Sequence, residues 1–403
     1  MPPFATLAKR AFEPDVAASS LSEQWKNPSD VFSVLLILGG DVVARALAQL
    51  AGSRFTPVAF SFGWAAYGIS VILSAVGKNR LMPPADFSCL VINGENGYVR
   101  QNSSWVIGRV VRDFNVWKDK QGSAVAKGNP AKDNGGPVAK CVESILDRKW
   151  EIMKEKAKEK GRKEPERPPK AGLCVSVYKA GRAKKGHAGH DAPYVTGCLT
   201  CVLQLAVAAI PCGVFGDWSV LLTTAAGIAL ALATGSLPQW EKEKWACRDG
   251  ARKTVVLTAG NGSQHAIVVQ GVGRGLDLED LAVAKTHVLA APGTWALLMV
   301  LGLFWVLLLV TATGIAERTW YLLAVGGLGI AQNLYAAGVA RSPEAFGMPL
   351  EFVEVLGEPK VMDALFAVER RYPGLGRSML STFFTTGLTK DEQDAWDSLE
   401  SAT

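Results

Sequence analysis

Long apolar runs alternate with long polar stretches along this chain of 403 residues. A helix needs about 20 apolar residues to cross the hydrocarbon core of a bilayer, which is roughly 30 Å thick. Six segments reach that length, and they predict three helical hairpins because each pair is joined by only a few residues. The segments are 31–51 with 55–77, 195–215 with 218–237, and 293–315 with 319–340.

Polar side chains interrupt some of these predicted spans. Asp41 and Arg45 lie near the middle of the first one, where each charge costs about 2.5–3.5 kcal/mol on insertion scales before any pairing. They are four residues apart, so they stack on one helical face and can neutralise each other. Gln204, Gln332 and Asn333 are the other polar residues in the predicted spans. With Gln204 and Asn333 the pair could line a polar path for transport, or the pair could pin the first helix to a bundle.

The polar stretches all fall on one side of the membrane in this arrangement. They cover residues 1–30, 78–194, 238–292 and 341–403, and they hold all but three of the Lys and Arg residues. Because positive flanks of spans stay in the cytosol, both termini are expected there. No signal-peptide core precedes residue 31, and seven scattered cysteines are unlike a secreted disulfide scaffold, which indicates a reducing compartment.

Each predicted hairpin is followed by an apolar strand, a glycine-containing turn and a helix. The second helices of the hairpins also align on a Gly-Ile-small pattern at Gly68, Gly227 and Gly329, which predicts helix-packing faces. This similarity indicates a threefold repeat, although chance alignment of Gly- and Leu-rich helices is the alternative. Strands are expected at 89–92, 173–178, 254–257, 266–269 and 352–356, and helices at 104–114, 278–285 and 361–371.

The predicted fold class is a membrane all-α bundle of six transmembrane helices with a small composite α/β cytosolic domain built from loops and tail. Parallel strands from the repeats are expected to share its sheet. The insert at 118–170 is rich in Lys, Glu, Gly and Pro, so it predicts either a solvated helix or a disordered linker.

Charge in the first cytosolic loop indicates a lipid partner. Residues 78–194 carry 24 Lys and Arg against 13 Asp and Glu, which favours contact with anionic lipid. The net charge of the whole chain is only +6, so nucleic-acid binding is not expected.

One weak motif could bind a metal. His187, His190, Cys198 and Cys201 supply imidazole and thiolate donors of the kind that hold tetrahedral zinc. However, Cys198 and Cys201 begin an apolar span, so a flexible loop followed by buried thiols is the favoured interpretation.

A glycine loop offers a second weak motif. Gly271, Gly273 and Gly275 follow an apolar strand and precede a helix, as the phosphate loop of a dinucleotide-binding fold does. Leu276 occupies the position where that motif requires its third glycine, so a simple hairpin is favoured. The sequence indicates no particular cofactor.

Two stretches carry a family resemblance. ATGSLPQWE at 233–241, and VMDAL at 361–365 with YPGLGR at 372–377, resemble a group of uncharacterised multi-pass membrane proteins of filamentous fungi. The resemblance implies membrane architecture and supplies no activity. The residues favour a non-catalytic scaffold or regulatory protein, then a transporter or channel, and thirdly a membrane-bound enzyme or nucleotide-binding protein.

Overall fold

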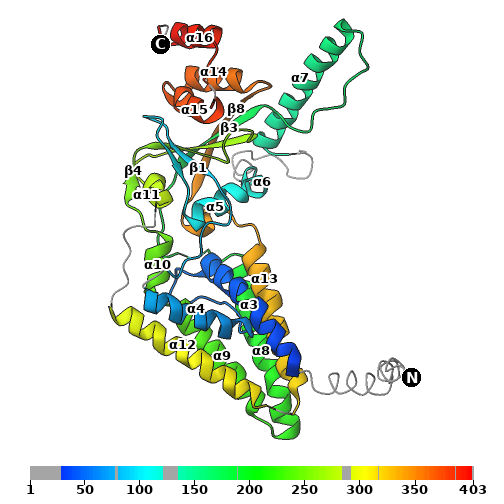
Figure 1. Cartoon of the computed structure of the whole chain (residues 1–403), viewed down its shortest axis with the longest axis vertical. Helices are drawn as coiled ribbons and strands as arrows, with labels where there is room; N and C mark the ends of the chain where they lie inside the picture. The colour runs from blue at the N-terminus through cyan, green and yellow to red at the C-terminus, as the bar shows by residue number, and fades with distance from the viewer. Residues whose placement is uncertain are drawn as a thin grey trace, which may run out of the picture. The chain divides into compact units, whose positions relative to one another are not determined.

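The computed structural model describes residues 29–77, 80–120, 135–187, 189–283, 292–315, 317–385 and 387–401. The chain divides into two compact units, one of helices and one that is α/β (Figure 1). Met1–Leu81, His190–Trp240 and Leu289–Val339 form the helical unit, and Met82–Gly189, Glu241–Val288 and Ala340–Thr403 form the α/β unit.

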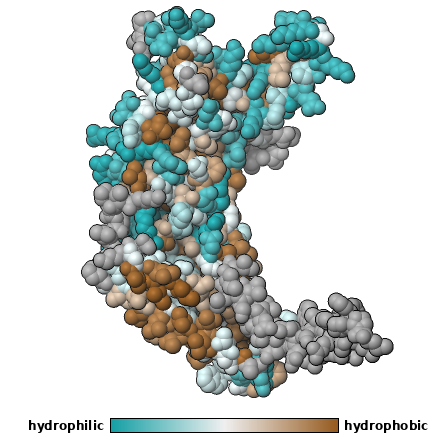
Figure 2. Space-filling view, in the orientation of Figure 1, coloured by the Kyte–Doolittle hydropathy of each residue, from teal (hydrophilic) through white to brown (hydrophobic). Residues whose placement is uncertain are grey.

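Two helices of the helical unit are long and apolar enough to cross a membrane. They are α8 (Ala192–Phe215) and α12 (Pro292–Thr313), and large apolar side chains are exposed along both. Figure 2 shows such side chains gathered over α12. Exposed apolar surface of this extent is typical of contact with lipid.

The prediction of a six-helix membrane bundle is wrong for the described residues, which contain two such helices, or three if α9 (Ser219–Gly235) and α10 (Pro238–Lys244) form one span bent by 44°. The segment 55–77 fails because residues 55–62 are not helical and α4 (Gly63–Gly77) has only 15 residues. At 1.5 Å per residue α4 covers about 22 Å, which is less than the apolar core of a bilayer.

Two further predicted spans, 31–51 and 319–340, are not among the helices of the described residues that are long and apolar enough to cross a membrane. In α13 (Thr319–Gly338), Gln332 and Asn333 lower the apolarity of an otherwise adequate length. In α3 (Ser29–Leu50), the side chains are described from residue 39 onward, so the first part of the predicted span 31–51 lies outside the described side chains.

The α/β unit is built on a mixed sheet of six strands, in the order β2-β1-β5-β6-β3-β8. It contains more than half of the chain, so the prediction of a small composite domain is wrong as well. A separate two-stranded sheet joins β4 (Asp249–Ala251) to β7 (Gly275–Leu276). The strands of the large sheet are β1 (Leu90–Asn93), β2 (Val99–Gln101), β3 (Leu173–Ala180), β5 (Thr254–Thr258), β6 (His265–Gln270) and β8 (Leu350–Glu358).

The predicted strands share this sheet, but the expectation that they run parallel is wrong. Only β3 and β6 pair in parallel, while the other neighbours are antiparallel. Short turns join β1 to β2 and β5 to β6, and such turns permit only antiparallel neighbours. The three strands that would be equivalent in a repeat are β1, β5 and β8. They have non-equivalent places in the sheet, and β1 runs opposite to β5 and β8.

Helices cover both faces of the sheet, and each face has its own apolar core. One core contains Val91, Leu257, Ile267 and Val269, and the other contains Ile92, Val175, Val256 and Val268, as expected from the alternation of side chains along a strand. The first face lies under α5 (Trp105–Arg112), α6 (Phe114–Trp117), α7 (Pro137–Glu159) and α11 (Leu278–Val283), and the second under α14 (Val361–Arg371), α15 (Leu375–Phe383) and α16 (Lys390–Ser401).

Candidate functional site

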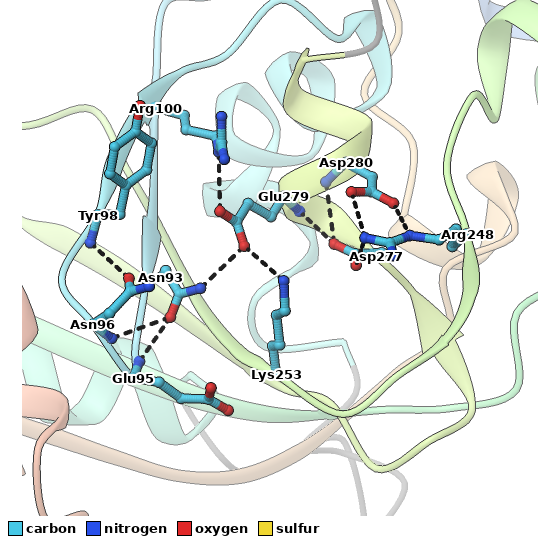
Figure 3. Close-up of polar contacts among 10 residues, drawn as sticks. All are labelled: Asn93, Glu95, Asn96, Tyr98, Arg100, Arg248, Lys253, Asp277, Glu279 and Asp280. Carbon is cyan, nitrogen blue, oxygen red and sulfur yellow. Dashed lines mark hydrogen bonds and ion pairs between the residues drawn. The ribbon is translucent and has the colours of Figure 1, made fainter. Parts of the chain in front are cut away.

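One carboxylate connects several segments of the α/β unit (Figure 3). Glu279, in α11, is only 8% exposed. Its Oε1 accepts a hydrogen bond from Nε of Arg100 at 3.0 Å, and its Oε2 accepts from Nδ2 of Asn93 at 3.0 Å and from Nζ of Lys253 at 3.2 Å. The partners belong to β2, to β1 and to the loop between β4 and β5, so Glu279 holds these segments to the helix.

A second set of contacts fixes the start of α11. Asp277 precedes the helix, and its Oδ1 accepts hydrogen bonds from the backbone N–H groups of Glu279 and Asp280, both at 3.1 Å. This is the bonding of a helix N-cap. Arg248 binds both carboxylate oxygens of Asp280, at 2.5 and 3.0 Å. The helix is therefore anchored at its first turn as well as through Glu279.

The charges in this network favour a structural role over proton transfer. Burial raises the pKa of Glu279, but hydrogen bonds from Arg100, Lys253 and Asn93 outweigh burial, and the pKa lies below its ordinary value. Hydrogen bonds from Arg248 likewise lower the pKa of Asp280. A carboxylate that stays ionised and fully bonded at neutral pH is a poor general acid or base.

The same network orders the turn between β1 and β2. Oδ1 of Asn93 accepts hydrogen bonds from the backbone of Glu95 at 2.9 Å and of Asn96 at 3.3 Å. Next to the turn, the Arg100 guanidinium lies 4.6 Å from the centre of the Tyr98 ring, which is 55% exposed. The turn thus presents an aromatic side chain from a rigid frame, as binding surfaces do.

A second ion-pair cluster lies buried beside α5. The Arg109 side chain is 1% exposed, and it lies between Asp86 at 3.1 Å and Asp113 at 3.6 Å. Arg112 contacts the same two carboxylates at 3.1 and 2.8 Å. Burial lowers the pKa of Arg109, while Asp113 and Asp86 act in the opposite direction. Two cations with two anions make a neutral set that fixes α5 in the core.

α7 and the segment that returns from it, residues 160–170, form an arm that extends from the sheet (Figure 1). The helix corrects the prediction of a disordered insert for residues 137–159, while residues 121–134 lie outside the described part. Near its root the arm is held by the ion pair of Arg148 with Glu358 at 2.9 Å and by Arg167, which binds Glu143 and Asp147.

The far end of the arm carries a different charge pattern. The last cation with a partner there is Lys154, whose Nζ lies 3.0 Å from Glu164 and 3.4 Å from the centre of the Trp150 ring. Beyond it five exposed cations face solvent, and within the described part of the chain none of them forms an ion pair. We call them the basic tip: Lys156, Lys158, Lys160, Arg162 and Lys163.

The intramembrane polar residues singled out from the sequence do not form one group. Asp41 and Arg45 pair at 2.9 Å, but their side chains are 69% and 46% exposed on the surface of α3. Gln204 and Asn333 are buried, and Gln332 is 8% exposed and binds Thr196 at 3.0 Å. The structure thus brings the pair together and separates it from the other three.

Gln204 and Asn333 instead form hydrogen bonds with the backbone of an extended segment, residues 55–62, in the helical unit. Asn333 accepts from the backbone N–H of Ala59 at 3.1 Å and donates to its carbonyl at 2.9 Å. Gln204 donates to the carbonyls of Phe60 at 2.6 Å and Val325 at 2.8 Å. Non-helical backbone is tolerated at membrane depth only where protein groups supply its hydrogen bonds.

The three glycines predicted to pack helices all meet close neighbours, in different surroundings. A Cβ on Gly68 would lie 2.7 Å from the Trp305 side chain on α12. On Gly227 and Gly329 it would meet Phe60 of the extended segment, at 2.4 Å from the ring and 1.7 Å from the carbonyl oxygen respectively. Gly227 and Gly329 therefore leave room for the extended segment, and they do not mark a helix–helix contact that is repeated in each hairpin.

An open hollow of about 590 Å³ lies by the turns that join α8 to α9 and α12 to α13. Asp217 and Arg318, from the two turns, pair at 3.1 Å across it. Arg318 also lies 4.6 Å from the centre of the Phe215 ring, and Trp218 is 64% exposed. Aromatic and arginine side chains at helix ends are typical of the membrane–water interface.

The proposed metal ligands are not assembled. His187 falls in the α/β unit, whereas His190, Cys198 and Cys201 fall in the helical unit. Within the described residues, no group of three or more His, Cys, Asp and Glu side chains could hold a metal ion.

The backbone of the glycine loop forms hydrogen bonds within the protein. The backbone N–H of Gly271 donates to Lys253 at 3.1 Å and that of Gly273 to Ala251 at 2.9 Å, while Gly275 lies in β7. The helix that follows, α11, has six residues. This geometry leaves the N–H groups of Gly271 and Gly273 occupied rather than directed at a phosphate.

Sequence reasoning missed Glu279 and Arg109. The partners of Glu279 lie 179, 186 and 26 residues away, so no local pattern marks it. Asp277 before an apolar stretch is a helix-start signal that could have drawn attention to α11. The Arg109–Asp113 spacing of four residues was the one visible sign of the buried cluster.

No family model, curated protein or solved structure matches this chain. The resemblance to fungal membrane proteins therefore stays a prediction.

Proposed function

We propose that this chain is a membrane-anchored, non-catalytic scaffold whose α/β unit attaches to an anionic lipid surface through the basic tip of the arm. The observation that carries the proposal is the difference in ion pairing between the root and the tip of the arm. Arg148 and Arg167 near the root form ion pairs, while the five cations of the tip are exposed, beside exposed Glu155 and Glu159, and form no ion pair within the described residues. Each Lys or Arg near an anionic membrane contributes about 1 kcal/mol of binding.

Anchoring is supported by α8 and α12, with their exposed apolar side chains, and by Trp218 and Arg318 at the helix ends. Transport, the second hypothesis, has less support, because Gln204 and Asn333 bond to backbone groups and Asp41 lies on the outer surface of α3. Nothing in the two ion-pair networks favours catalysis over structural support.

Binding of vesicles would test the lipid contact. The full chain in nanodiscs of neutral lipid is mixed with vesicles of phosphatidylcholine, with or without phosphatidylserine, and co-flotation is measured. We expect binding only to the vesicles that contain phosphatidylserine, and a decline with rising salt. Replacing the five cations of the basic tip with Gln should abolish most of the binding.

A matched control distinguishes the effect of the basic tip from the effect of the net charge of the chain. Five exposed cations elsewhere in the α/β unit are replaced with Gln: Lys179, Lys242, Arg252, Arg274 and Lys360. This variant has the same net charge as the tip variant, and it should bind nearly as well as the natural chain. Equal losses in both variants, or binding to neutral vesicles, would contradict the proposal.

We also propose that the α/β unit faces the cytosol. Two glycosylation sequons lie in it, at Asn102 and Asn261. Asn102 is buried and bonds to Ser104, so its state says little about orientation. Asn261 is exposed in the turn between β5 and β6, and it should carry no glycan in the native host. Mass spectrometry that finds a glycan on Asn261 would reverse the orientation.

A further inference from the structure

Two thiols from distant parts of the sequence meet at the root of the arm. Cys141 lies in the second turn of α7, and Cys174 lies in β3, between β6 and β8 in the large sheet. Cys174 is fully buried and belongs to the core on the α7 face of the sheet, against which Cys141 packs. Cys141 is partly exposed, so a small reagent can reach it.

A glycine allows the two thiols to pack close together. Gly357 in β8 is the cross-strand partner of Cys174. A Cβ at Gly357 would lie 3.3 Å from Sγ of Cys141 and 2.4 Å from Ile145, so a larger residue would push α7 away from the strands. The missing side chain lets the Cys141 sulfur lie over the strand next to Cys174.

The two thiols differ in acidity. The side-chain interaction with Cys174 lowers the pKa of Cys141 against the effect of burial, and Arg148 lowers it further. The same interaction, together with burial, raises the pKa of Cys174. An accessible, more acidic thiol beside a second thiol is the arrangement found in redox-sensing cysteines.

We propose that Cys141 and Cys174 form a reversible disulfide in response to a hydroperoxide, and that this disulfide joins the arm to β3. The Cys141 thiolate attacks the terminal peroxide oxygen, so that an S–O bond forms and the O–O bond breaks. The alkoxide or hydroxide that leaves takes up the proton that the Cys141 thiol released, and becomes an alcohol or water. The Cys174 sulfur then attacks the sulfenic acid of Cys141. An S–S bond forms, the S–O bond breaks, and hydroxide leaves as water with the Cys174 proton.

The two thiols together supply the two electrons that reduce the peroxide, and a dithiol reductant reverses the reaction. This inference stands apart from the lipid-binding proposal, because disulfide formation is detected without vesicles.

Peptide mapping tests the proposal on the reduced full chain in nanodiscs. The chain is treated with a small excess of hydrogen peroxide, free thiols are blocked, and the digest is analysed by mass spectrometry without reduction. We expect the Cys141–Cys174 peptide pair to be the main linked product and to disappear after treatment with dithiothreitol. Linked pairs scattered among other cysteines, or no linkage, would overturn the proposal without any need for a variant.

Two variants identify the order of the steps. In Cys174→Ser the sulfenic acid has no partner, so dimedone should label Cys141 several-fold more than in the natural chain. A matched control, Cys89→Ser, alters another buried thiol on the same face of the sheet and should leave the disulfide yield unchanged. Labelling of Cys141 no greater than that of Cys201 or Cys247 in the Cys174→Ser variant would contradict the assignment.

Discussion

At the scale of single residues, buried charge is the feature that distinguishes this molecule. Glu279 and Arg109 are both nearly inaccessible, and each contacts two or more oppositely charged groups. Removing one member of such a set leaves its partners uncompensated, which is more costly than losing an exposed pair. Each is therefore expected to matter for stability.

Glu279→Gln should reduce the free energy of unfolding by about 1–3 kcal/mol at pH 7, because Arg100 and Lys253 lose their charged partner. Since folding lowers the pKa of Glu279, its contribution is complete above the unfolded value of 4.5 and is lost as the pH falls through the folded value. Thermal unfolding in detergent from pH 7 to pH 3 should show the two proteins converging in acid.

The control for this prediction is Glu155→Gln, at an exposed position of α7. It should leave the unfolding temperature nearly unchanged at every pH. If the two variants behaved alike, or if the difference for Glu279→Gln grew in acid, the Glu279 network would not contribute as described.

At the scale of elements, the extended segment 55–62 is the feature that most changes the helical unit. Its apolar composition is the same as that of a membrane helix, so the sequence predicts a span there. The distinguishing contacts come from Gln204 and Asn333, which lie far along the chain and supply its hydrogen bonds. Distant partners of this kind leave no periodic signal.

Gly329→Ala should destabilise the helical unit, because the new Cβ would lie 1.7 Å from the Phe60 carbonyl oxygen, which is backbone and cannot rotate away. We expect a loss of about 1–3 kcal/mol, typical of overpacking. Gly327→Ala on the same helix is the control, since a Cβ there meets nothing within 4 Å and Ala favours the helix. Equal unfolding temperatures for the two variants in detergent would contradict this packing.

Elements with local signals were predictable. α14 spans Val361–Arg371, the same bounds that its apolar spacing predicts, and the strands were placed within about two residues at most ends. Strand directions were not predictable from a repeat pattern, because the turn lengths decide them. For the arm the sequence allowed two predictions, because a highly charged sequence is compatible with a solvated helix and with a disordered linker.

At the scale of the whole molecule, the described residues combine two or three helices that could cross a membrane with an α/β unit that carries the larger share of the chain. Hydropathy predicted helices that could cross a membrane and overestimated their number, because it cannot separate an apolar helix from an apolar extended segment. The candidate sites depended on contacts between distant segments and were outside the reach of the sequence.

Hydrogen exchange of the full chain in neutral nanodiscs, with and without anionic vesicles, tests the central proposal of an anchored scaffold most directly. Amides of α8 and α12 should exchange slowly in both conditions, and peptides covering Lys156–Lys163 should slow only when phosphatidylserine vesicles are present. Fast exchange in α8 and α12, or a basic tip that exchanges equally fast with anionic, neutral and no vesicles, would contradict it.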